Sequence, residues 1–319
     1  KVYLTANILP HNDDIEEFEE FVKDIKNYGF DAVLVADLGL FDMMQELAPE
    51  IPIHVSTQAN NINYRSAIKW YKMGATRVVL AREMSFKEIA EFQKKIPEDL
   101  ELEAFIHGAM CISYSGRCLL SNYMTGRDSN MGACAHPCRW NYKLVEETRP
   151  GEYMDVFENE RGTFIFNSKD LCTIRHIPEL VQSGIASLKI EGRVKTSYYV
   201  ATVVGAYRRE IDRYCADPEN YVFNEAEYEE LCKVSHRPYT TGFYFGKPDE
   251  NSQVYTSSSY IRDYDLIGIV KDYDEKTGIA TITQRNRFFK GDEIEIIQPM
   301  KPFFVQTVES MCDKNGNEI

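Results

Sequence analysis

Residues 31–57 read DAVLVADLGLFDMMQELAPEIPIHVST, and this stretch decides the fold class. It opens with the apolar run DAVLVAD (31–37), which is typical of a strand buried on both faces. Residues 38–48 then have apolar side chains at helical spacing, and residues 51–57 form a second β-rich run. A strand, a helix and another strand in succession predict a parallel sheet covered by helices.

The same alternation extends in both directions along the chain. We predict strands at 2–9, 31–37, 51–57, 77–83, 101–107 and 186–192, and helices at 13–28, 38–48, 63–73, 85–96, 174–183 and 197–215. A (β/α)8 TIM-type barrel needs eight such units, so six of them suggest that two more precede Lys1. The competing architecture is a doubly wound open sheet, which normally has a glycine-rich phosphate turn after its first strand. We find no such turn here.

Two segments depart from this pattern. Residues 142–170 alternate polar and apolar side chains around turn-like residues 149–151, which predicts an inserted β-hairpin. Short β-rich runs at 266–270, 279–283 and 293–297 predict a small all-β domain, which ends in a hairpin turn without a returning strand. The predicted organisation is a partial (β/α) barrel over 1–245 with a Cys-rich insertion at 108–172, a linker at 246–262, and a small β domain at 263–319, whose unfinished last hairpin suggests truncation.

Composition excludes several classes of protein. The 319 residues include 50 acidic and 36 basic side chains, for a net charge of −14. Such a surface does not coat nucleic acid non-specifically, although a local basic groove is compatible with it. We expect no membrane interaction, since no run of eighteen apolar residues occurs. No secretory signal is recognisable, and we expect a cytoplasmic protein.

Polar residues follow the predicted strands, where barrel enzymes keep their sites. They are Asn7, Asp37, Gln58, Arg82, Glu83, His107, Glu191 and Arg193. The alternative is that strand ends are polar because they meet solvent. The catalytic residues are not identified by this pattern, and His107, Glu191 and Arg193 are the candidates. His107 is suited to acid–base chemistry, or is simply a buried histidine at a strand end.

Five of the eight cysteines are concentrated in one part of the chain, at Cys111, Cys118, Cys134, Cys138 and Cys172. The first four lie in a glycine-punctuated loop after the strand predicted at 101–107. Thiolates at this density favour a metal or an iron–sulfur cluster. Structural zinc sites usually use paired C-x2-C motifs, which are absent here. The alternative is a set of buried free cysteines.

The sequence around this loop has a long and specific motif. Residues 103–121, EAFIHGAMCISYSGRCLLS, fit the pattern E-x-F-x-x-G-S/A-apolar-C-x4-G-x-C-x-apolar-S, which resembles the signature of peptidase family U32, the collagenase-like proteases. Further similar segments are NYMTGRD (122–128), CRW (138–140), NSKDLC (167–172) and KIEGR (189–193). The resemblance covers residues 1 to about 245, and the C-terminal part resembles the family's β domain.

The resemblance is closest to the branch that hydroxylates the wobble uridine of tRNA without oxygen gas. It implies a 4Fe–4S cluster bound by Cys111, Cys118, Cys134 and Cys172, with Cys138 as the alternative to Cys134. It also implies tRNA as partner, a hydroxyl derived from prephenate or a related small molecule, and a related U32 protein as a further partner.

Two other functions stay open. A U32 peptidase needs a hydrolytic site, which the metal-assisted set of His107, Glu103 and the thiolates would have to provide. The sequence has no G-x-S-x-G elbow, no H-E-x-x-H motif and no cysteine with a recognisable histidine partner. The third function is a non-catalytic scaffold in which a cluster or zinc only fixes the long loop.

An RNA substrate requires basic and aromatic groups. Residues 187–213 contain six basic and three acidic side chains, and the loop adds Arg117, Arg127 and Arg139. Aromatic residues suited to stacking on bases are Tyr198, Tyr199, Tyr207 and Trp140. The alternative, which spacing alone favours, is a solvated helix face with its aromatics in the core.

Overall fold

The computed structural model describes residues 1–111, 113–114, 118–140, 144–145, 153–154, 168–246, 260–299 and 301–318. Contacts divide the chain into two compact units. The first comprises Lys1–Glu191 and Arg237–Ser259, and the second comprises Gly192–His236 and Tyr260–Ile319. This division differs from the predicted domain boundaries, because residues 192–236 group with the C-terminal segment.

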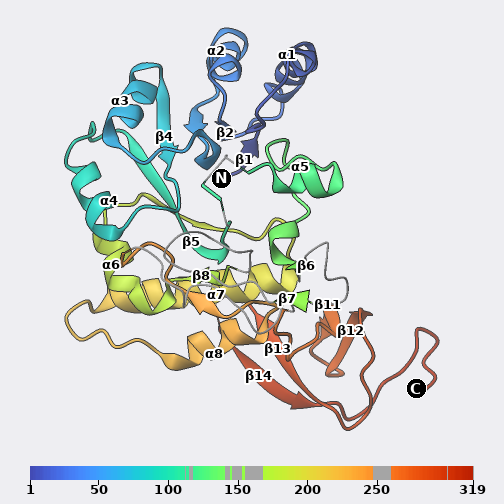
Figure 1. Ribbon diagram of the computed structural model, residues 1–319. Coiled ribbons are helices and arrows are strands. Elements are labelled where there is room, and N and C mark those ends of the chain that lie inside the picture. Colours follow the sequence, from blue (N-terminus) through green and yellow to red (C-terminus); the bar gives the residue numbers. More distant parts are fainter. Residues whose placement is uncertain are drawn as a thin grey trace. The chain divides into compact units, whose positions relative to one another are not determined.

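The first unit contains the predicted alternation of strands and helices (Figure 1). Its strands are β1 (Tyr3–Thr5), β2 (Ala32–Val35), β3 (Ile53–Val55), β4 (Ala75–Val79), β5 (Glu101–Ala109), β6 (Leu144–Val145), β7 (Tyr153–Met154), β8 (Asp170–Cys172), β9 (Ser187–Ile190) and β10 (Tyr239–Thr240). Its α-helices are α1 (Asp13–Ile25), α2 (Leu38–Leu47), α3 (Tyr64–Lys72), α4 (Phe86–Gln93), α5 (Leu120–Thr125) and α6 (Ile177–Gln182). Short 3-10 turns are η1 (Thr57–Ala59), η2 (Pro137–Arg139) and η3 (Ile174–His176).

The central sheet runs in the order β1-β2-β3-β4-β5-β8-β10, and β9 also pairs with β5. Strands β1 to β5 and β9 are parallel to their neighbours, so the predicted α/β class with a mostly parallel sheet is confirmed. The exception is β8, which pairs antiparallel with the end of β5. Among the described strands, no pairing closes the sheet into a barrel.

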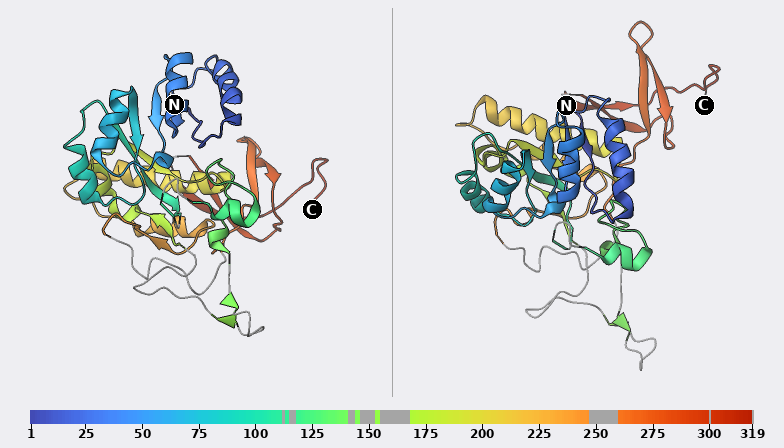
Figure 2. Two further views of the ribbon diagram at one scale, coloured as in Figure 1. Left: turned by 45° about the horizontal axis from the view of Figure 1, so that its top comes forward. Right: turned by 90° about the horizontal axis from the view of Figure 1, so that it is seen from above.

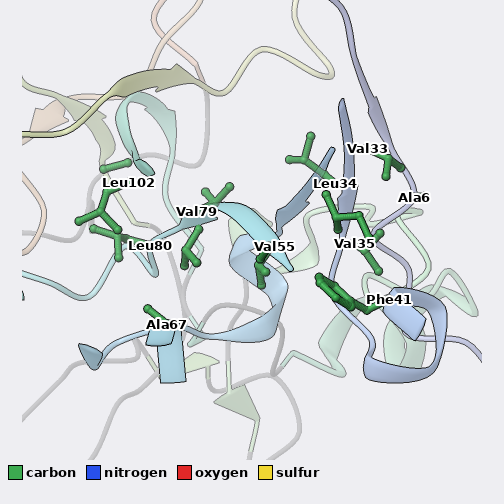
Figure 3. Close-up of a cluster of buried hydrophobic side chains, with 14 of the residues drawn as sticks. Ala6, Val33, Leu34, Val35, Phe41, Val55, Ala67, Val79, Leu80 and Leu102 are labelled. Atoms are coloured by element: carbon green, nitrogen blue, oxygen red, sulfur yellow. The ribbon is translucent and has the colours of Figure 1, made fainter. Parts of the chain in front are cut away.

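The core lies between the sheet and helices α1 to α4. All four residues of β2 are buried, as its continuous apolar run predicts. Figure 3 shows Val33, Val55 and Phe41 among the side chains of this layer, with Phe41 contributed by α2. Helix starts are fixed by side chains: Asp37 caps α2, and Ser85 forms a capping box with Glu88 at the start of α4.

The predicted inserted hairpin is described only in part. Strands β6 and β7 pair antiparallel, in agreement with the prediction. The turn at 149–151 and most of the remaining insertion lie outside the described residues. Among the described residues, no helix is both long and apolar enough to cross a membrane.

The second unit consists of two helices and two hairpins. Its elements are α7 (Ser197–Ala216), α8 (Glu225–Lys233), β11 (Gly268–Asp274), β12 (Ile279–Gln284), β13 (Glu293–Gln298) and β14 (Lys301–Thr307). Strand pairs β11–β12 and β13–β14 are antiparallel. An ion pair of 2.8 Å between Lys233 and Glu295 joins α8 to β13.

Candidate functional site around the end of strand β5

Strand β5 ends in a tight contact with the residue that follows β9. Gly108 has a φ of +110°, a backbone conformation that residues other than glycine rarely adopt. A Cβ atom added at this position would lie 2.5 Å from the carbonyl oxygen of Glu191. The Glu191 N–H donates to the carbonyl of His107 at 2.9 Å. The glycine of the motif therefore allows β9 to approach β5 just before Cys111.

A cation and an aromatic ring lie beside this contact. The Arg82 guanidinium, after β4, lies 3.8 Å from the centre of the Phe105 ring. The same guanidinium forms an ion pair with Glu191, whose carboxylate oxygen lies 3.6 Å from Arg82 Nη2. The ammonium of Lys189 lies 5.4 Å from the same ring. Strands β4, β5 and β9 thus place two cations next to Phe105.

A buried ionic network extends from here along the sheet. Glu103 accepts from Lys189 at 2.8 Å and from Arg77 at 3.1 Å, and Arg77 also pairs with Glu101. Burial alone would raise the pKa of Glu103, but Lys189, a hydrogen bond from Ser187 and Arg77 together hold it below its usual value. Glu103 is therefore held ionised.

His54 lies on the neighbouring strand β3 and pairs in register with Arg77. Burial, supported by the charge of Arg77, lowers the pKa of His54 to about 4. This histidine is therefore neutral at physiological pH. The network is a neutralised core layer, and its charges are matched across strands that lie far apart in the sequence.

Two of the five clustered thiols are in direct contact. The Cys111 thiol donates to the sulfur of Cys118, and this hydrogen bond raises the pKa of Cys111. The same bond, together with backbone N–H groups of Leu120 and Ser121, lowers the pKa of Cys118 to about 5. A lowered pKa favours the thiolate of Cys118, which is the form that binds metals.

The other three thiols, those of Cys134, Cys138 and Cys172, come from the same loop and from strand β8. Cys138 lies near enough for its charge to raise the pKa of Cys111 further. The sulfur of Cys134 accepts the His136 N–H at 3.4 Å, and Cys172 lies in β8 in register with His107. Among the residues that the structure describes, no three or more His, Cys, Asp or Glu side chains are arranged to hold a metal ion.

The cysteine loop is tied together by side-chain hydrogen bonds. The carbonyl of Cys118 accepts from Ser129 Oγ at 2.7 Å and from Asn130 Nδ2 at 3.4 Å. The buried Ser121 Oγ accepts the N–H of Ala135, next to Cys134, at 2.9 Å. The carbonyl of Asn130 accepts the Leu9 N–H at 3.1 Å, which joins the loop to the chain after β1.

The structure places the residues predicted for the site in different parts of the molecule. His107 is buried in β5, with its ring 5.3 Å from that of Tyr239, and Glu191 lies beside it. Arg193 belongs to the second unit. Asp37 serves as a helix cap, and Asn7 donates to Ser56 at 2.9 Å.

The predicted stacking surface on α7 is wrong for two of its tyrosines. Tyr199 and Tyr207 are each 2% exposed, so they belong to the core of the second unit. Ion pairs also neutralise three arginines of this helix, joining Arg208 to Asp212, Arg209 to Glu227 and Arg213 to Glu210. The alternative of a solvated helix with core aromatics describes α7 better.

Sequence reasoning missed the partners of Glu103, because Arg77 and Lys189 meet it only through strand register. It also missed the exposed tyrosines of the cysteine loop.

Two models of known protein families together match most of this chain. The model of "Peptidase family U32" matches residues 1–254, which include both strand ends and all five clustered cysteines. The chain belongs to peptidase family U32. The model of the "Peptidase family U32 C-terminal domain" matches residues 262–319, and so covers both hairpins of the second unit.

Relatives of this U32 chain carry two kinds of name. "tRNA hydroxylation protein P1" of Bacillus subtilis (strain 168) is 43% identical over 100% of this chain and 75% of its own length. "tRNA hydroxylation protein P" of Escherichia coli (strain K12) is 37% identical over 94% of this chain and 74% of its own. "Collagenase" of Porphyromonas gingivalis is 30% identical, over 98% and 76% respectively.

Proposed function

We propose that this U32 protein is an enzyme that hydroxylates tRNA, with the wobble uridine as the modified nucleotide. The observation that carries the proposal is the thiol pair of Cys111 and Cys118 at the end of β5, in a chain that matches tRNA hydroxylation proteins over most of its length. Its partners in this proposal are tRNA, prephenate or a related small molecule as the hydroxyl source, and a related U32 protein. Its place is the cytoplasm.

The proposed cofactor is a 4Fe–4S cluster with Cys111, Cys118, Cys134 and Cys172 as ligands, and Cys138 in place of Cys134 as the alternative. The contact between Cys111 and Cys118 and the thiolate character of Cys118 fit such a ligand pair. Cys134 and Cys138 lie in the same loop as this pair, and Cys172 lies in β8, but among the described residues no three or more metal-binding side chains surround one position. The cluster, when bound, would supply one-electron redox chemistry.

The protein's own side chains have simpler tasks in this proposal. Arg82, with its guanidinium over Phe105 and 3.6 Å from a carboxylate oxygen of Glu191, supplies positive charge at these strand ends. His107 and Glu191 remain the candidates for moving a proton, and the Gly108 contact fixes their strand ends together. These groups lie at carboxyl ends of parallel strands, where α/β enzymes bind substrates.

The peptidase alternative has weaker support. It required Glu103 as part of a metal-assisted hydrolytic set. Glu103 is instead held by Lys189 and Arg77, and its ionised form is stabilised in the core. Removing it from this network would leave two buried or half-buried cations without their shared partner.

We also propose that the sheet is part of a (β/α)8 barrel. The support is the unbroken parallel order of β1, β2, β3, β4, β5 and β9, with polar side chains of the ionic network along one face. A crystal structure in which β1 and β9 are joined through further strands would support the barrel, and one with two free edges would exclude it.

The test is anaerobic purification followed by iron and sulfide determination and EPR spectroscopy. We expect about four irons per chain for a 4Fe–4S cluster. Alanine variants of the five clustered cysteines should lose the iron in four of five cases. Cys215→Ala, an exposed cysteine of the second unit, is the matched control and should keep it. A protein with zinc or no metal, and tRNA left unmodified, would refute the proposal.

A further inference from the structure

The cysteine loop exposes an unusual number of large apolar side chains. Tyr114 is 57% exposed and Tyr123, on the short helix α5, is 86% exposed. Trp140, one of two tryptophans in the chain, is 45% exposed at the end of the same loop. Large aromatic side chains that are exposed within one segment of the chain are typical of interaction surfaces. We call Tyr114, Tyr123, Arg127 and Trp140 the loop face. Figure 2 shows α5, in green, standing out from the sheet.

The loop is also locally basic in an acidic protein. Residues 113–140 contain three arginines and one acidic residue, Asp128, although the chain has a net charge of −14. The Asp128 carboxylate is occupied inside the loop, where it accepts from the Asn130 N–H at 2.7 Å and from Asn122 Nδ2 at 3.1 Å. Within the described part of the chain, Arg127 is exposed and forms no ion pair. The loop face therefore contains an exposed arginine as well as exposed aromatic side chains.

Helix α7 has the opposite character, although the sequence made it the first candidate for RNA. Its Tyr199 and Tyr207 are buried, and its arginines are neutralised by carboxylates. Aromatic rings that stack on bases must be exposed, and cations that bind phosphate must not be saturated by carboxylates. The loop face meets both conditions.

We propose that the loop face binds unpaired nucleotides of an RNA loop, with bases stacked on Tyr123, Tyr114 and Trp140 and a phosphate on Arg127. This inference rests on the proposed function and assigns the surface that receives the RNA. Stacking accepts any base, and an arginine binds phosphate oxygens through two donors, so single-stranded RNA matches the surface in chemistry and in charge. The hydrogen bond from the Ala135 N–H to Ser121 Oγ ties α5, which carries Tyr123, to the residue after Cys134, so the proposed RNA surface and the cysteines belong to one loop.

The experiment measures binding of the full, iron-loaded chain to a fluorescent anticodon stem–loop RNA and to a blunt RNA duplex of equal length. Tyr123→Ala should weaken stem–loop binding by about tenfold and leave duplex binding nearly unchanged. Tyr28→Ala is the matched control, since Tyr28 is 74% exposed on the same unit but outside the loop. Because Tyr123 is 86% exposed, its removal leaves the fold intact.

The charge on the loop face is tested by the salt dependence of binding. Arg127→Gln should reduce the slope of log affinity against log salt by about 0.7 to 1, the effect of one phosphate contact. Arg65→Gln is the control, because Arg65 is also an exposed arginine near a tyrosine ring, 5.8 Å from that of Tyr64. An unchanged slope for Arg127→Gln would exclude this contact.

Stacking on Trp140 has its own spectroscopic readout. In the variant Trp70→Phe, Trp140 is the sole tryptophan, and stem–loop RNA should quench its fluorescence. Equal affinities for Tyr123→Ala and Tyr28→Ala, with hydroxylation intact in both, would overturn the surface but not the proposed function. Wild-type protein that loads iron but neither binds nor modifies RNA would overturn both. Binding of anionic lipid vesicles in preference to the stem–loop would overturn the RNA assignment.

Discussion

Replacement of Gly108 by alanine tests how β5 meets β9 at the site. A Cβ at Gly108 would lie 2.5 Å from the Glu191 carbonyl oxygen and 2.8 Å from the Glu191 Cβ. Ordinary van der Waals contact begins at 3.4 Å, so the backbone after β9 would have to retreat by roughly 1 Å. The atoms it meets are mainly backbone, which cannot swing aside as a flexible side chain can.

Two separate costs lower the free energy of unfolding of Gly108→Ala. A positive φ costs an alanine about 1–2 kcal/mol, and overpacking against a fixed backbone costs about 1–3 kcal/mol more. We therefore expect Gly108→Ala to lower the free energy of unfolding by about 2–5 kcal/mol. Gly29→Ala is the control, because Gly29 has a φ of +68° and nothing within 4 Å of its added Cβ. It should lose only the first amount.

The assay is urea unfolding followed by tryptophan fluorescence. Both tryptophans, Trp70 and Trp140, belong to the first unit, so the signal reports on the unit that contains Gly108. The difference between the two alanine variants isolates the contact with Glu191. Equal losses in Gly108→Ala and Gly29→Ala would refute the register of β5 and β9 described here.

Three further variants test the rest of the first unit. The pKa of His54 is about 4 in the folded protein and about 6.5 in the unfolded chain, so the unfolded chain takes up a proton first as the pH falls. The free energy of unfolding of the wild type should therefore fall by up to about 3 kcal/mol between about pH 6.5 and pH 4, and His54→Gln should remove this pH dependence. In urea unfolding, Glu103→Gln should lower the free energy of unfolding by about 3–5 kcal/mol, whereas Glu91→Gln, at an exposed ion pair, should change it little. Similar losses in the two variants would contradict a buried ionic network around Glu103. Ser121→Ala should lower stability by about 1–3 kcal/mol and reduce iron retention, because the Ala135 N–H loses its acceptor; unchanged values in both would contradict its role in the loop.

Much of the fold could be predicted because the signals are local. The apolar run at 31–37 and the helical spacing after it depend only on neighbouring residues, and β2 and α2 occur where they indicate. Strand β8 could not be predicted, since its three residues pair antiparallel with β5 across a long insertion. Strand β14 was missed because Pro302 near its start weakens a strand pattern.

The candidate site divides in the same way. The cysteines and Gly108 stand out in the motif, because thiols at that density and a glycine at the end of a predicted strand can be recognised from neighbouring residues alone. The pairing of Glu103 with Lys189 joins positions 86 residues apart and follows only from the register of β5 and β9. Exposure is likewise a tertiary property, which is why the sequence favoured Tyr199 over Tyr123 as a stacking residue.

The most direct test of the central claim is mass spectrometry of tRNA nucleosides from cells that lack this protein, complemented with the wild type or with Cys111→Ala. We predict that the wild type restores one added oxygen on the wobble uridine. We expect that Cys111→Ala, expressed at equal level, does not restore it, whereas Cys215→Ala does. Wobble uridine without the added oxygen in wild-type cells, or full restoration by Cys111→Ala, would contradict this claim.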